Sequence, residues 1–130
     1  LVRQAPERQP VTASPIHRPA NDLLTVEVSE PAPLARLTVS GEIDSSSAPL
    51  LREQLDTLLD SPLSELTIDL GGVTFLDSAG LCVLAAVHRR IGSDVSIRVL
   101  ASSRAVIRPL QITGLWQLLH AEQVGETAVA

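Results

Sequence analysis

Aromatic residues and cysteine are scarce in this sequence. Its 130 residues include one Phe, one Trp, one Cys and no Tyr. So few aromatic rings leave little surface for stacking nucleobases, which disfavours nucleic-acid binding of that kind. With Cys82 as the single cysteine, neither an intramolecular disulfide nor a cysteine-based zinc cluster can form within one chain.

Lysine is absent, and positive charge is not concentrated at any point. All ten basic residues are arginines scattered along the chain, and the formal net charge is -5. Nothing resembles a basic stripe that could follow a phosphate backbone. No apolar run approaches the roughly 20 residues of a membrane span, and no signal-peptide segment is evident. We therefore expect a cytoplasmic protein that binds neither nucleic acid nor membrane.

What the chain does contain is a large aliphatic fraction, with 45% hydrophobic and 19% charged residues. This composition is typical of one globular domain with a sizeable core. Residues 1–22 differ, because prolines recur regularly there without a helical or strand period. We predict a disordered, Pro-rich N-terminal tail over residues 1–22, with a docking arm as the alternative, and a folded domain over residues 23–130.

Hydrophobic periodicity predicts the elements of that domain. Leu24, Val26 and Val28 alternate with polar residues, as do Leu37 and Val39, which predicts an antiparallel hairpin of two strands. A helix should begin near Pro49, followed by a strand over residues 65–70 that Gly71 and Gly72 end, a helix from Ser78 and a strand over residues 95–99. A third helix should be capped by Ser102 or Ser103, be kinked or end early near Pro109, and stop at Gly114. A short last strand and a helical or frayed tail should complete the chain.

This order of elements predicts the fold class. Strands alternate with helices after an opening hairpin, and the strands alternate in polarity instead of being apolar throughout. Such a pattern is typical of an α/β domain with a mixed sheet of about four to five strands and helices packed mainly on one face.

Ser78 is the candidate modification site. It follows Asp77 at the expected start of a helix, where free backbone N–H groups and the positive end of the helix dipole favour an added phosphate. The alternative is that Ser78 serves only as the N-cap of that helix, worth about 1 kcal/mol.

Three segments, LTVSGEIDSSSAPLL, LTIDLGGVTFLDSAGLCVL and ITGLWQLL, together resemble the STAS domains of anti-sigma factor antagonists. The resemblance extends over about residues 23–122. Its most specific part is FLDSAGL, which is similar to the family's Asp-Ser-Ser/Thr-Gly-Leu signature, and the block from Gly41 to Asp44 is the second. The resemblance implies the STAS fold.

The resemblance also implies a function without enzymatic activity or a cofactor. In the family, the unphosphorylated protein binds an anti-sigma factor of histidine-kinase-like ATPase fold and thereby releases a sigma factor. That partner phosphorylates the serine, here Ser78, and a PP2C-type phosphatase restores it. Such a protein would be a monomer or a weak homodimer. Carried over by position, the partner-binding residues are Asp44, Asp77, Ser78, Ala79, Gly80 and Leu81.

Two positions depart from the family pattern. Ala79 replaces the usual hydroxyl residue after the phosphoserine, which excludes a second acceptor there. Cys82 replaces a frequent glycine, and we expect it to be packed in the core, with a redox-sensitive thiol as the alternative. We also expect Asp44 to be exposed in its loop, so that Asp44→Ala impairs partner binding without unfolding the domain.

Other functions receive less support from the sequence. Asp44 and Asp77 could form a carboxylate pair for acid–base catalysis or Mg²⁺, but no third ligand group lies close in sequence. A hydrolase nucleophile at Ser78 would need a base, and its surroundings do not match G-x-S-x-G. A STAS scaffold or sensory module remains the alternative, although such members usually carry an N-terminal domain or follow a membrane region, which favours the free-standing antagonist here.

Overall fold

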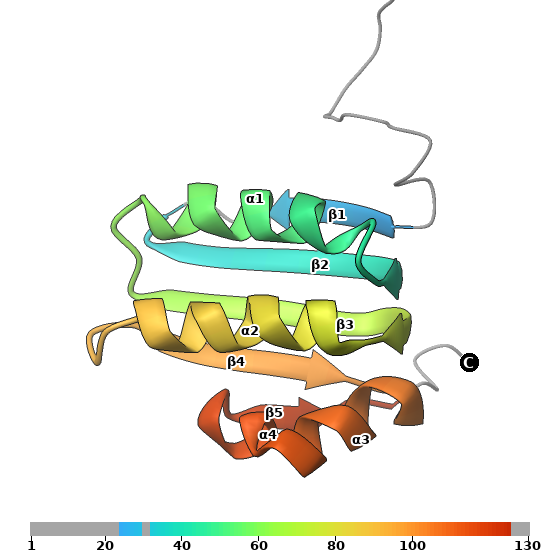
Figure 1. Cartoon of the computed structure of the whole chain (residues 1–130). Helices are drawn as coiled ribbons and strands as arrows, with labels where there is room; N and C mark the ends of the chain where they lie inside the picture. The colour runs from blue at the N-terminus through green and yellow to red at the C-terminus, as the bar shows by residue number, and fades with distance from the viewer. Residues whose placement is uncertain (1–23, 30–31, 126–130) are drawn as a thin grey trace, which may run out of the picture.

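The structure is a computed structural model that describes residues 24–29 and 32–125. The predicted N-terminal tail lies outside the described residues. The strands are β1 (Leu24–Ser29), β2 (Leu34–Ile43), β3 (Glu65–Leu76), β4 (Ser96–Ala101) and β5 (Ala121–Gln123), and the helices are α1 (Ala48–Leu59), α2 (Ser78–Arg90), α3 (Arg104–Thr113) and α4 (Leu115–Leu118) (Figure 1).

The strands form one mixed sheet in the order β1-β2-β3-β4-β5. β1 pairs with β2 antiparallel, as the hairpin prediction required, and the other neighbours are parallel. Along β2 the side chains of Leu37 and Val39 are buried, whereas those of Arg36 and Thr38, which alternate with them, are only partly buried. The buried face of the sheet shares a single core with all four helices, including Leu51 of α1. Figure 1 shows α1 and α2 on the same face of the sheet, running alongside the strands. The predicted mixed sheet with helices mainly on one face is confirmed.

The third strand is longer than predicted. Gly71 and Gly72 do not end β3, which continues to Leu76. The pairing of β2 with β3 shifts register at this point, so the two glycines lie at a bulge. A Cβ on Gly72 would lie 2.7 Å from the hydroxyl oxygen of Ser40, so the missing side chain allows β2 and β3 to stay close. The extension carries the chain directly to Asp77 and Ser78.

The C-terminal elements occur in the opposite order to the prediction. Gly114, with φ of 82°, ends α3 as expected, but α4 follows it and the short strand β5 comes last. Leu115 and Leu119 are both buried, and their four-residue spacing places them on one helical face. α3 also continues past Pro109 to Thr113. Within the described ranges, no helix combines the length and apolarity needed to cross a membrane.

Candidate partner-binding site

The ends of β2 and β3 bring two of the predicted site residues together. Ile43 and Leu76 are paired across the two strands, so Asp44 and Asp77 leave the sheet side by side. The backbone N–H of Asp77 donates to the carbonyl of Ile43 at 3.2 Å, which ties the two loops. The sequence blocks that were separated by more than thirty residues therefore form one edge of the molecule.

Asp77, and not Ser78, is the N-cap of α2. Its Oδ1 accepts hydrogen bonds from the backbone N–H groups of Ala79 at 2.9 Å and Gly80 at 3.4 Å. Ser78 is the first residue of the helix, is exposed, and makes no side-chain hydrogen bond within the described part of the chain. The alternative that Ser78 serves only as a helix cap is therefore wrong.

Because Asp77 caps α2, fewer backbone N–H groups are available to a phosphate on Ser78 than the sequence suggested. Two of the backbone N–H groups that were expected to favour it are already bonded to the Asp77 carboxylate. A phosphate would still lie at the positive end of the α2 dipole, but beside a carboxylate and directed to solvent. The charge of the phosphate would thus be exposed at the surface and would not be neutralised by the backbone N–H groups of the helix end.

Gly80 contributes to the site through the packing of α2 and not through an exposed surface. It is buried, and a Cβ there would lie 2.7 Å from Cγ2 of Ile43 and in direct collision with Cδ1 of Leu76. The glycine allows the first turn of α2 to pack closely on β2 and β3. Any contact with a partner falls to its exposed or half-exposed neighbours, namely Ser78, Ala79 and Leu81.

Asp44 orders the loop that precedes α1. Its Oδ1 accepts hydrogen bonds from the backbone N–H and hydroxyl of Ser46, at 2.9 and 2.8 Å, and from the backbone N–H of Ser47 at 3.1 Å. The hydroxyl of Ser47 in turn donates to the carbonyl of Glu42 at 2.8 Å. Asp44 is half-exposed, so the expectation of a merely exposed contact residue is incomplete. Its carboxylate also has a structural role.

These bonds predict a pH effect at Asp44. The Ser46 hydroxyl, followed by the two backbone N–H groups, holds the pKa of Asp44 below its ordinary value of 3.8. Because the folded-state pKa is lowered, the stabilisation is complete above the unfolded pKa and disappears as the pH falls through the folded pKa. We expect Asp44→Ala to lower the melting temperature, and Asp44→Asn to lower it less because an amide oxygen remains.

The check is thermal unfolding of wild type and both variants, followed by circular dichroism from neutral to strongly acidic pH. The advantage of wild type over Asp44→Asn should shrink on acidification below about pH 4. An advantage that stays constant or grows would show that the charge of Asp44 does not stabilise its loop.

Cys82 does not occupy the core position that was predicted for it. It is exposed, because Val83, Leu84 and Val87 form the buried stripe of α2 and Cys82 lies outside that stripe. Because most residues of this helix are apolar, the sequence does not show which of them face the core. The expectation of a packed cysteine is wrong.

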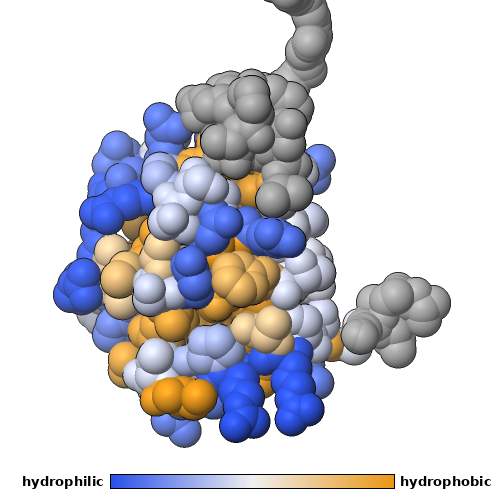
Figure 2. Space-filling view, turned by 45° about the vertical axis from the view of Figure 1, so that its right-hand side comes forward, coloured by the Kyte–Doolittle hydropathy of each residue, from blue (hydrophilic) through white to orange (hydrophobic). Residues whose placement is uncertain are grey.

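Sequence reasoning missed the exposed aromatic side chain of Phe75, three residues before Ser78. Phe75 is 45% exposed, although it lies in the apolar run that ends β3. A second register shift, between Gly41 and Glu42 of β2, accompanies this position, and Leu76 is buried in its place. Figure 2 looks towards this end of the molecule and shows apolar residues gathered among polar and charged ones. No pattern in the sequence reveals the shift.

A comparison with known families decides the kind of domain. The family model described as "Mlab, STAS domain" matches residues 26–120. This chain belongs to the STAS domain family. The described residues of this STAS domain contain no group of three or more His, Cys, Asp or Glu side chains placed to hold a metal ion.

Several relatives share most of the STAS domain. Anti-sigma-F factor antagonist RsfB of Mycobacterium tuberculosis strain H37Rv is 38% identical over 96 residues, which cover 74% of this chain and 79% of the relative. The anti-sigma-B factor antagonist of Bacillus subtilis strain 168 is 31% identical, covering 82% and 97% respectively. The crystal structure of an anti-sigma factor antagonist from Mycobacterium paratuberculosis superposes with a TM-score of 0.73 at 33% identity, covering 88% of this chain and 96% of the other.

Proposed function

We propose that this STAS domain is an anti-sigma factor antagonist, which binds an anti-sigma factor through the edge formed by Asp44, Asp77 and Ser78 and thereby releases a sigma factor. Phosphorylation of Ser78 inactivates it. The observation that carries the proposal is the placement of Ser78. Ser78 is exposed, takes no part in capping α2, and lies one helical turn before the half-buried Leu81.

The unphosphorylated surface suits a protein partner. Phe75, three residues before Ser78, and the half-buried Leu81, three residues after it, supply apolar area, while Asp44 and Asp77 supply negative charge. Apolar groups ringed by polar ones are typical of a specific protein interface. Relatives that are named anti-sigma factor antagonists support an anti-sigma factor as that partner.

A phosphate on Ser78 would oppose this contact. It adds about -1.5 to -2 charge at neutral pH, next to the carboxylate of Asp77. The phosphate would also have to lose its hydration water when the partner binds. The backbone donors that could neutralise it are partly engaged already. The modification thus weakens binding while leaving the domain folded.

The partner that fits this cycle is a kinase. We propose an anti-sigma factor of histidine-kinase-like ATPase fold, which binds the exposed Ser78 hydroxyl with ATP in place and phosphorylates it, and a PP2C-type phosphatase that reverses the reaction. The STAS domain itself supplies the acceptor and the docking surface, and acts as a regulator without a catalytic role. It works as a monomer or a weak homodimer.

The test is affinity capture from the lysate of the source organism in the presence of ATP, with wild type, Ser78→Ala and Ser78→Glu as baits. Mass spectrometry identifies the retained proteins and maps phosphate on the wild-type bait. We expect a kinase-like anti-sigma factor on wild type and Ser78→Ala but not on Ser78→Glu, and phosphate on Ser78. The same partners on all three baits, or no protein of that fold, would favour a STAS scaffold or sensory module.

A further inference from the structure

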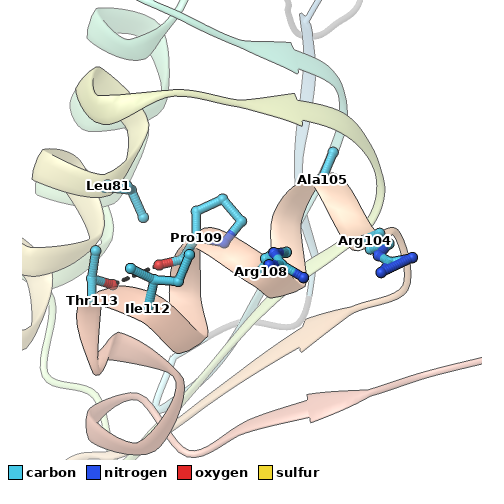
Figure 3. Close-up of a pocket in the computed structure, with 7 residues that line it drawn as sticks. All are labelled: Leu81, Arg104, Ala105, Arg108, Pro109, Ile112 and Thr113. Atoms are coloured by element: carbon cyan, nitrogen blue, oxygen red, sulfur yellow. Dashed lines mark hydrogen bonds between the residues drawn. The ribbon is translucent and has the colours of Figure 1, made fainter.

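A shallow groove, open to solvent, lies between the first turns of α2 and the length of α3. Its volume is about 530 Å³. Figure 3 shows Leu81 facing α3 across it, with the other lining side chains carried by α3. The lining residues are Leu81, Arg104, Ala105, Arg108, Pro109, Ile112 and Thr113.

The floor of this α2–α3 groove is apolar and lacks a cover among the described residues. Ile112 is 75% exposed, whereas Val106 and Leu110 already provide the buried stripe of α3. Leu81 and Pro109 are half-buried and complete the apolar lining. A large aliphatic side chain that faces solvent beside a groove is typical of a docking site.

The flank of the groove carries two positive charges. Arg104 and Arg108 are one turn apart on α3, and both are exposed. No ion pair within residues 24–29 and 32–125 involves either of them. Most arginines in this range are paired: Arg36 with Asp69, Arg52 with Asp56, Arg90 with Asp56 and Asp60, and Arg98 with Glu122. Arg89 is also without an ion pair in this range, but it lies in the last turn of α2, whereas Arg104 and Arg108 line the apolar groove.

We propose that the α2–α3 groove receives an acidic amphipathic segment of the anti-sigma factor, and that Arg104 and Arg108 select it by charge. Apolar side chains of the segment rest on Leu81 and Ile112, and its carboxylates pair with the two guanidinium groups. Guanidinium binds carboxylate through paired hydrogen bonds, which gives direction as well as attraction. A basic segment would meet like charge at the same place and be rejected.

The groove continues the surface already assigned to the partner. Leu81 follows Ser78 by three residues, so the two lie on neighbouring positions of the same helical face. A partner that contacts the Ser78 hydroxyl therefore reaches the groove without leaving the surface. This inference rests on the proposed function, since the occupant is the same anti-sigma factor.

A designed peptide tests the groove separately from the Ser78 switch. The probe is an amphipathic helical peptide of about 16 residues with leucines spaced three and four apart and glutamates on both flanks, compared with its lysine counterpart. The full chain is titrated with each peptide and followed by ¹H–¹⁵N NMR. We expect the glutamate peptide to shift the amide signals of Leu81, Arg108 and Ile112, and the lysine peptide to leave them in place.

Charge-reversal variants complete the test. The double change Arg104→Glu and Arg108→Glu should weaken the glutamate peptide by about tenfold or more and favour the lysine peptide. Arg89→Glu is the matched control, because Arg89 is an exposed arginine at the far end of α2 without an ion pair in the described residues, and it should change neither affinity.

Three results would overturn the inference. One is equal binding of both peptides, the second is absence of binding, and the third is a set of concentration-dependent shifts at the groove without peptide, which would assign it to a second copy of this chain. The proposed function can fail on its own: if Ser78→Glu retains the anti-sigma factor while the peptide result holds, the switch is wrong and the groove assignment stands.

Discussion

Replacing Ser78 with Glu is expected to weaken binding of the anti-sigma factor by about a hundredfold, equivalent to roughly 3 kcal/mol. Ser78 is exposed and makes no hydrogen bond that the substitution would break among the described residues, so the domain should remain folded. The new carboxylate would lie next to that of Asp77 and would lose its hydration water when the partner binds. Ser78→Ala removes only a hydroxyl and should bind about as tightly as wild type.

Isothermal titration calorimetry with the purified anti-sigma factor measures these affinities. Ser93→Glu is the control, because Ser93 is also an exposed serine but lies in the loop after α2, away from the start of that helix. It should bind like wild type. If Ser78→Glu and Ser93→Glu bind equally well, the charge at position 78 does not control the contact and the switch mechanism is wrong.

Replacing Gly80 with Val is expected to destabilise the fold by about 3 kcal/mol, lowering the melting temperature by more than about 10 °C. Even a bare Cβ at this position would meet Ile43 at 2.7 Å and collide with Leu76. Both of these side chains are buried at the ends of β2 and β3, so the helix would have to move away from the sheet. That movement would displace Ser78, two residues earlier.

Denaturant unfolding followed by circular dichroism checks this result. Gly92→Val is the matched control, because a Cβ on Gly92 meets no atom within 4 Å. Its effect should stay within about 0.5 kcal/mol. Failure of Gly80→Val to accumulate as folded protein agrees with the expectation, whereas stability equal to that of Gly92→Val would show that α2 does not depend on a close approach at Gly80.

Local patterns were sufficient to predict most of the fold. Alternating polarity placed β1 and β2, because helices cover mainly one face of this sheet. Pro49 marked the first turn of α1, and Gly114 marked the end of α3 through its positive φ. These signals depend on neighbours in sequence, which a single chain reveals directly.

Features set by pairing between distant segments could not be predicted in this way. Gly71 and Gly72 read locally as the end of a strand, but β3 bulges there against β2 and continues to Leu76. The exposure of Phe75 accompanies a second shift in the same pairing. Leu115 and Leu119 fit a short helix only once their burial against the core is known.

The candidate site was predicted in part. The sequence placed Asp77 and Ser78 at the start of a helix, and the structure adds that Asp44 leaves the sheet beside them. It also assigns the cap to Asp77, because that side chain and not Ser78 reaches the backbone N–H groups. The predicted burial of Cys82 was wrong, because the sequence of an almost wholly apolar helix does not show which face is buried.

The groove beside α3 could not be foreseen, because Leu81 and Ile112 come from separate helices. In sequence, Ile112 reads as one more core residue of an amphipathic helix. Only the packing of Val106 and Leu110 against the sheet leaves it outside. In sequence, Arg104 and Arg108 are not distinguished from the other scattered arginines.

Displacement of a sigma factor tests the central claim most directly. A purified complex of the anti-sigma factor with its sigma factor is titrated with this chain, either unphosphorylated or stoichiometrically phosphorylated on Ser78, and free sigma factor is measured by size-exclusion chromatography. We expect the unphosphorylated chain to release the sigma factor at near-equal amounts, and the phosphorylated chain to release none at the same concentration. Equal release by both forms, or by neither, would contradict the claim.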